Sequence, residues 1–277
     1  MNSDKFDLKA MLDAWKTDPE TQELLNRLGS DYDENGIPYW EKMNNITVLD
    51  KGYVRLVDTL GDDLSIVNAA RVSYDKESKE FTDKDIKLIN FLIREQHTSP
   101  LRHAAMTFEV YAPLMVARQW WKYAVASTHI DDQNGWNESS RRYITEAEEF
   151  YIPKGDNWRS KPANSKQGSG PVLDTSIGGY FTNKLFDIVE SANKLYHQAM
   201  EAGIAPEQAR LFLPAYGMYV RWRWTVSLQG VITFLDQRLE HDAQVEIQEY
   251  AKAINSLTKQ AFPNVMNAID KGDLNVN

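Results

Sequence analysis

The sequence predicts an α+β fold for this chain of 277 residues. Strand-like and helix-like segments are interspersed along the chain without the βαβ rhythm of a doubly wound sheet. Neither glycine-rich phosphate loop, GxGxxG or GxxxxGKS/T, occurs in the sequence. A Rossmann-type or Walker-type nucleotide site is therefore not expected.

An N-terminal helical extension is expected at residues 1–46, followed by a main domain at 47–277. Apolar residues recur at helical spacing within 7–16, and a second short helix is indicated at 21–29, where Gly29 ends it. A polar stretch with turn signals then leads into the domain. We assign the extension no chemistry.

The elements of the main domain follow from hydrophobic period and from capping and turn residues. Pro113 separates a strand pattern from a helix pattern, and Ser227 is the expected N-cap of a late helix. In chain order, the segments are a strand at 48–61, helices at 63–73 and 83–96, a strand and a helix within 104–123, a loop at 153–179, a helix at 181–200, a helix beginning at 206, a strand at 219–227, and helices at 227–239 and 243–262.

The loop at 153–179 is poor in large apolar residues and rich in Gly, Ser and Pro. Long loops in compact domains often serve as functional lids. The helix expected after it is amphipathic, and its apolar side consists of Phe181, Leu185, Ile188, Leu195 and Tyr196.

Composition excludes several classes of protein. A formal net charge of −9 argues against a protein that binds a nucleic-acid polymer. The absence of cysteine excludes a disulfide scaffold, a thiolate metal site and a cysteine nucleophile. The five histidines form no tight ligand pair, so no metal site is expected. Without a signal peptide or a long apolar run, we expect a cytoplasmic protein that does not enter membranes.

Residues 135–143, GWNESSRRY, combine two aromatic rings with an amide, a carboxylate, hydroxyls and two guanidinium groups. A solvated loop explains this composition. A site for a small, planar, anionic ligand explains it as well, with Arg141 and Arg142 holding a phosphate and Asn137 and Glu138 bonding to a heterocycle. The local density of arginine on an acidic chain suits a small anion better than a polymer.

Other candidate residues also have two interpretations. Tryptophans such as those in RQWWKY, 118–123, usually lie in a core, but burying the charged ends of this run is costly unless they are paired. In RWRWTV, 221–226, arginines and tryptophans alternate, which favours a solvated arginine face. Arg238, near a helix end, is by itself an exposed cation. His97 and His103 flank a Ser-Pro turn, where side chains can face a pocket.

Taken together, the segments from about Ile46 to the C-terminus resemble the flavin-dependent thymidylate synthases. Several landmarks occur in the family's order, which is more specific than any single motif. They are LDKGYVRLVDTLGDDLSIVNAARVSY, HTSPLRHAAMTFEVYAPLMVARQWW, NESSRRY, EEFYIP, EAGIAPEQARLFLP, WTVSLQGVITFLDQR and AQVEIQEYA.

The resemblance implies an α+β fold with an antiparallel sheet and packed helices, assembled as a homotetramer with shared active sites. It implies conversion of dUMP to dTMP with FAD as cofactor and with NADPH and methylenetetrahydrofolate as co-substrates. The family does not attack the nucleotide with a cysteine, which agrees with a chain that has none.

The resemblance also implies roles for residues at matching positions. Arg238 matches the catalytic arginine that polarises the uracil, and Arg210 matches a dUMP ligand from a neighbouring subunit. The expected substrate-binding residues are Gln119, Trp120, Trp121, Lys122, Glu138, Ser139, Ser140, Arg141, Arg142, Arg210 and Arg238. The expected cofactor-binding residues are Ser73, His97, Ser99, Lys122, Tyr123, Asn137, Glu138, Ser227, Gln229 and Thr233.

The chain departs from the family mainly on the flavin side. Lys122, Tyr123 and Ala124 replace the signature Arg-His-Arg, and an insertion at 127–136 follows them. Lys122 keeps the charge but not the bidentate fork of an arginine. Further departures are Ser227, Gln229 and Thr233, where the family commonly has Asn, Arg and Asn, and Asp242, at a frequent histidine position.

Three readings follow from this pattern. The chain is a divergent thymidylate synthase with a rebuilt flavin pocket, a relative that yields hydroxymethyl-dUMP, or a nucleotide-binding protein without catalysis. The first is favoured.

Overall fold

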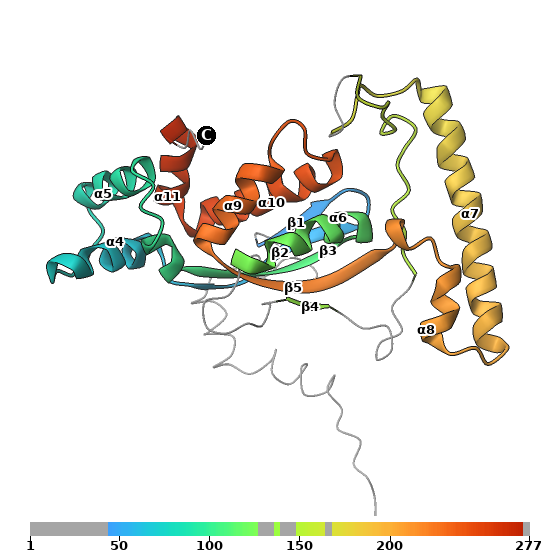
Figure 1. The fold of residues 1–277 in the computed structure, drawn as a ribbon, viewed down its shortest axis with the longest axis horizontal. Coiled ribbons are helices and arrows are strands. Elements are labelled where there is room, and N and C mark those ends of the chain that lie inside the picture. The colour runs from blue at the N-terminus through green and yellow to red at the C-terminus, as the bar shows by residue number, and fades with distance from the viewer. Residues whose placement is uncertain (1–43, 127–135, 139–147, 164–167, 274–277) are drawn as a thin grey trace, which may run out of the picture. The chain divides into compact units, whose positions relative to one another are not determined.

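The computed structural model describes residues 44–126, 136–138, 148–163 and 168–273 (Figure 1). Residues 45–277 form one unit by their internal contacts. The expected helical extension lies outside the described residues except for its last three positions. Its structure and the boundary at residues 46 and 47 therefore stay predictions.

The order of elements within the described residues agrees with the expected mixture of strands and helices. The strands are β1 (Asn45–Val48), β2 (Gly52–Leu60), β3 (Ala105–Pro113), β4 (Trp136–Glu138) and β5 (Tyr219–Ser227). The helices are α4 (Asp63–Arg71), α5 (Asp83–Arg94), α6 (Leu114–Trp120), α7 (Thr175–Glu201), α8 (Pro206–Ala209), α9 (Leu228–Arg238), α10 (Val245–Ala261) and α11 (Pro263–Ala268). Shorter helical turns are η1 (Val72–Tyr74), η2 (Pro100–His103), η3 (Trp121–Ala126), η4 (Arg210–Phe212), η5 (Ala215–Gly217) and η6 (Ile269–Asp273).

The strands form an antiparallel sheet in the order β1-β2-β3-β5-β4. The segment expected as one strand at 48–61 is a hairpin, because β1 turns back into β2 between Val48 and Gly52. Helices α6, α9 and α10 pack on one face of the sheet (Figure 1). The α+β fold with an antiparallel sheet and packed helices is therefore confirmed.

Alternation along the strands divides the sheet into an apolar and a polar face. Trp222 and Trp224 on β5 are buried against the helices, whereas Arg223 between them is exposed on the other face. On that polar face, Glu109 lies 3.2 Å from Arg55 and 3.5 Å from Arg223. The expected arginine face of β5 is confirmed, and it leaves the tryptophans in the core.

Buried polar groups fix two of the helix ends. Ser227 caps α9 as expected, since its hydroxyl oxygen accepts a hydrogen bond from the Gly230 amide at 3.2 Å. The cap of α4 is Asp62. The neighbouring carboxylate of Asp63 is buried and accepts hydrogen bonds from the backbone amides of Asn264 and Val265, so it joins α4 to the start of α11.

Helix α7 begins at Thr175, so the expectation that the loop runs to residue 179 is wrong at its end. Two glycines in TSIGG suggested a loop, but Gly178 is a contact position. A Cβ there would lie 1.9 Å from the carbonyl oxygen of Gly155. The absence of a side chain lets the helix touch the 153–157 segment.

The apolar side of α7 is only partly covered by this chain. Val189 is buried and Leu185 and Tyr196 pack beside it, but Phe181 and Ile188 are about half exposed. Among the described helices, none has a stretch long and apolar enough to cross a membrane.

Candidate functional site

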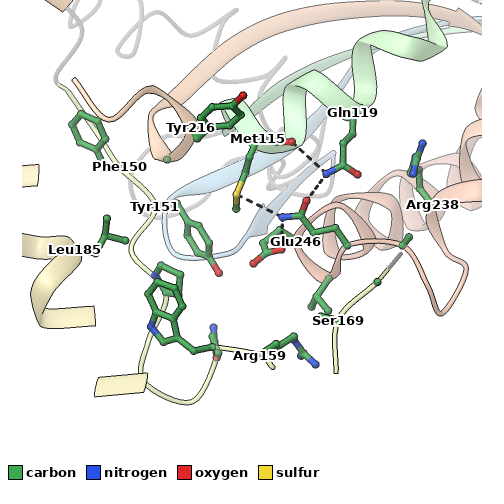
Figure 2. A pocket seen from close by; sticks show the side chains of 18 of the residues that line it. Met115, Gln119, Phe150, Tyr151, Arg159, Ser169, Leu185, Tyr216, Arg238 and Glu246 are labelled. Atoms are coloured by element: carbon green, nitrogen blue, oxygen red, sulfur yellow. Dashed lines mark hydrogen bonds between the residues drawn. The ribbon is translucent and has the colours of Figure 1, made fainter. Parts of the chain in front are cut away.

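A cavity of about 1120 Å³ opens where α6, the end of α9 and the start of α10 meet the segments at 150–159 and 214–217 (Figure 2). Its volume is that of a site for a nucleotide or a larger ligand. Its cations are Lys122, Arg159 and Arg238, and its carboxylates are Glu240, Asp242 and Glu246.

Arg238, the last residue of α9, is half-buried at the cavity wall. Its guanidinium carbon lies 5.2 Å from the ring centroid of Tyr123, within the range of a cation–π contact. Its Nε is buried, and no group of the described residues accepts a hydrogen bond from it. A buried donor without an acceptor is costly, so this position suits an arginine that binds a ligand better than a solvated helix-end cation.

The ring of Tyr123 packs against the guanidinium of Arg238. Only 7% of Tyr123 is exposed, and its ring packs edge-on against Phe234 with a centroid distance of 5.1 Å. The hydroxyl donates a hydrogen bond to Oε1 of Gln237 at 2.7 Å. Burial raises the pKa of Tyr123, against a lowering by the Arg238 guanidinium, so the phenol stays a neutral donor.

Three side chains form a hydrogen-bonded row along one cavity wall. Gln119 on α6 donates from Nε2 to Oε1 of Gln244, the residue before α10. Gln244 in turn donates from its own Nε2 to Oε2 of Glu246 at 2.7 Å. The hydrogen bonds thus connect the carboxylate of Glu246 to the amide of Gln119, and both side chains line the cavity.

The segment at 151–159 closes another side of the cavity. Burial, and next the charge of Glu246, raise the pKa of Tyr151 to about 12. Trp158 is anchored by a hydrogen bond from its indole Nε1 to Thr182 on α7 at 2.9 Å. A β-bridge between Arg159 and Val172 pins the backbone beside it, while Arg159 lines the cavity. The loop expected at 153–179 therefore contributes directly to the cavity.

Of the predicted site residues that the structure describes, Gln119, Lys122 and Arg238 meet in this cavity. Trp120 does not, because its ring is wholly buried and stacks on Phe234 at 4.5 Å. We correct its expected substrate contact to a core role. Ser227 is 2% exposed and serves as a helix cap, and its expected flavin contact stays a prediction.

Further predicted residues have other surroundings. Trp121 is half-buried against the core. Gln229 and Thr233 lie one turn apart on α9, where the Thr233 hydroxyl donates to the Gln229 carbonyl at 3.0 Å. The ring of Tyr123 contacts Phe234 edge-on and has the Arg238 guanidinium 5.2 Å from its centroid, and its expected cofactor contact stays a prediction.

Another group of predicted residues is exposed and outside the cavity. Ser73 lies in η1, and His97 and Ser99 precede η2. Arg210 begins η4, beside α7 and α8. Within one chain, these residues do not meet Arg238.

The polar run at 137–142 is described only in part. Asn137 and Glu138 lie in β4, paired with Arg223 and Trp222 of β5, and their backbone alone is described. Ser139, Ser140, Arg141 and Arg142 lie outside the described residues, so their expected ligand contacts stay predictions.

Several cavity residues were missed by the sequence reasoning. Gln244 and Glu246 fall within AQVEIQEYA, which was used as a landmark but given no role. Gln237 and Tyr151 were likewise not singled out. Arg159 sits in a loop of polar composition, where one arginine carries no signal of its own. Among the described residues, no group of three or more His, Asp or Glu side chains is placed to hold a metal ion.

Comparison with known proteins identifies the family. Residues 55–264 match the family model described as thymidylate synthase complementing protein. A flavin-dependent thymidylate synthase of Thermosipho melanesiensis is 38% identical over 216 residues, covering 78% of this chain and 89% of that protein. One from Thermus thermophilus is 40% identical over 219 residues, covering 79% and 75%. The chain belongs to the family of flavin-dependent thymidylate synthases, which are methyltransferases.

A solved structure supports the same assignment. A UMP/dUMP methylase, PolB from Streptomyces cacaoi bound with 5-Br dUMP, is 28% identical with a TM-score of 0.70. The match covers 83% of this chain and 99% of that protein. The fold and the resemblance seen in the sequence are thus confirmed together.

Proposed function

We propose that this enzyme converts dUMP to dTMP, with methylenetetrahydrofolate as the one-carbon donor, FAD as the cofactor and NADPH as the hydride source. The observation that carries the proposal is Arg238. It presents a half-buried guanidinium with an unpartnered Nε to a nucleotide-sized cavity. A preorganised donor of this kind stabilises negative charge as it develops on a bound uracil.

The cavity residues fit a nucleotide. Arg238 polarises the base and increases its carbon nucleophilicity, which replaces the cysteine that this chain lacks. Lys122 and Arg159 supply positive charge for phosphate or carboxylate groups of the ligands. A bound flavin would supply the hydride-transfer chemistry between NADPH and the transferred carbon.

The flavin-side residues fit a cofactor held between copies of the chain. Ser73, His97 and Ser99 are exposed on one part of the domain, away from the cavity that contains Lys122 and Arg238. We therefore propose a homotetramer whose active sites combine residues of neighbouring subunits. The incompletely covered apolar side of α7 supports association.

An omission assay tests the function. Purified protein is incubated with dUMP, methylenetetrahydrofolate, NADPH and FAD, and dTMP is measured by chromatography while each component is left out in turn. We expect dTMP in the complete mixture and none without dUMP, methylenetetrahydrofolate or NADPH, whereas omission of added FAD stops the reaction only in protein stripped of bound flavin. Formation of dTMP without NADPH, or none at all in the complete mixture from protein that holds FAD, contradicts the proposal. The same assay is run with UMP in place of dUMP as the alternative substrate.

Replacing His97 by Ala is expected to weaken FAD retention at least tenfold while dUMP binding changes little. The His97 side chain is exposed and its ring contacts only Phe91 among the described aromatic residues, at 5.6 Å between centroids, so its loss costs little stability. Bound flavin is measured by visible absorbance and dUMP affinity by calorimetry. Equal loss of both ligands contradicts a local flavin contact.

Replacing Tyr123 by Leu is expected to lower dTMP turnover about tenfold, because the cation–π contact with Arg238 is lost. Tyr123→Phe keeps the ring and loses the hydroxyl with its bond to Gln237, so we expect a change below about threefold. Flavin reduction by NADPH without dUMP serves as the control and stays unchanged in both variants. Equal turnover of the Leu and Phe variants contradicts a role for the ring.

A further inference from the structure

Along the wall of the cavity, one side-chain oxygen accepts no hydrogen bond from the described residues. The Nε2 group of Gln244 donates to Glu246 and lies 3.6 Å from the sulfur of Met115. The Nε2 group of Gln119 donates to Gln244 and to the backbone carbonyl of Met115 at 3.4 Å. Both amide nitrogens are therefore committed, and Oε1 of Gln119 accepts no hydrogen bond within the described residues.

Glu246 determines which way both amides point. An ionised carboxylate only accepts hydrogen bonds, so Gln244 has to turn its nitrogen toward Glu246 and its oxygen toward Gln119. Gln119 must then turn its nitrogen toward Gln244. Rotating either amide by half a turn would set oxygen against oxygen or nitrogen against nitrogen. The polarity of Gln119 is thus set by Glu246 through Gln244, and the longer 3.4 Å bond to the Met115 carbonyl favours the same orientation.

The free oxygen of Gln119 lies on the side of the cavity that contains Arg238. Figure 2 shows Oε1 of Gln119 directed toward Arg238, and both residues line the cavity. The cavity wall consequently offers a hydrogen-bond acceptor that points toward a hydrogen-bond donor. A ligand that is complementary to this wall presents a hydrogen-bond donor to Gln119 and, beside it, a hydrogen-bond acceptor to Arg238.

We propose that Glu246 and Gln244 are positioning residues that make this site select uracil over cytosine. This inference rests on the proposed function, in which a pyrimidine nucleotide binds beside Arg238. Uracil presents an N3–H donor next to a carbonyl oxygen, so N3–H bonds to Gln119 and the carbonyl to Arg238. Cytosine has an unprotonated N3, which would place acceptor against acceptor at Gln119.

The size of the effect follows from the cost of an unmatched polar pair. A site built around hydrogen bonds rejects an analogue that lacks the matching group far more strongly than an apolar pocket does. The wild-type site is expected to prefer dUMP over dCMP by at least about a hundredfold in affinity. Releasing the amides should lower that ratio about tenfold, since Gln119 can then turn its nitrogen to N3 of cytosine.

The test is calorimetric binding of dUMP and dCMP to the FAD-loaded enzyme and its variants. Glu246→Gln replaces the acceptor-only group by an amide that can donate, so both rotations of Gln244 become available. Glu249→Gln makes the same chemical change on α10 at a residue that pairs with Lys252 outside the cavity. We expect the preference for dUMP to fall about tenfold in Glu246→Gln and to stay at the wild-type ratio in Glu249→Gln.

Gln244→Leu is the second variant, because it removes the hydrogen bonds between Gln119 and Glu246 without altering a charge. It is judged by the same ratio of dUMP to dCMP affinity if Glu246→Gln does not fold. An unchanged ratio in a folded variant of either kind overturns the inference, as does wild-type protein that binds the two nucleotides equally. A wild-type protein that binds no dUMP overturns the proposed function instead, and the inference with it.

Discussion

Replacing Arg238 by Lys is expected to lower dTMP formation about 10²–10³-fold. Lysine keeps the charge but lacks the planar fork and the Nε donor that is buried without a partner at the cavity wall. Flavin reduction by NADPH alone involves no uracil, so we expect it to survive. The two reactions are measured separately, the first as dTMP released and the second as bleaching of the flavin absorbance.

The melting temperature separates a chemical role from a structural one. Lysine also places a cation over Tyr123, so we expect Arg238→Lys to melt within a few degrees of the wild-type protein. Near-normal turnover in a folded Arg238→Lys variant would show that Arg238 does not act on the uracil. Loss of flavin reduction together with turnover would point to a disturbed fold.

Mixing two inactive variants is expected to restore activity. Arg210 is exposed on η4 and does not line the cavity that contains Arg238, and in the proposed homotetramer we expect one site to draw the two arginines from different subunits. Arg210→Ala and Arg238→Ala should each lose about a hundredfold in turnover alone. After dissociation and random reassembly of equal amounts, about a quarter of the sites carry both arginines, so about a quarter of wild-type turnover should return.

The controls for mixing are reassembly of each variant with itself and a size measurement of the mixed sample. Activity that fails to return in a confirmed mixed oligomer contradicts shared sites. Full activity of Arg210→Ala alone shows instead that Arg210 is a surface residue. A monomer with full activity, seen by light scattering at micromolar concentration, contradicts the proposed homotetramer.

The fold was largely predictable because local patterns and tertiary contacts agree. Alternation in β5 placed Trp222 and Trp224 in the core, and Ser227 was identified as a cap by its position before an apolar run. The start of α7 was missed because Gly178 reads as a loop residue, although its small size serves contact with Gly155. The hairpin at 48–52 was read as one strand, since its turn is short.

The site was predictable only where the resemblance supplied roles. The role of Arg238 was expected from the resemblance, but its contact with Tyr123 joins two residues far apart in the sequence, which no local pattern shows. The row from Glu246 to Gln119 joins α10 to α6 in the same way. Trp120 was expected at the ligand from the resemblance alone, yet its ring is wholly buried.

The most direct test of the proposed reaction is the mass of the nucleotide product. Wild-type enzyme is incubated with dUMP, NADPH and methylenetetrahydrofolate that carries deuterium on the transferred carbon, and the product is analysed by mass spectrometry. We expect dTMP with the label in its methyl group, because the one-carbon unit is transferred and then reduced. Labelled hydroxymethyl-dUMP as the product, or unchanged dUMP from protein that holds FAD, would contradict the assignment as a thymidylate synthase.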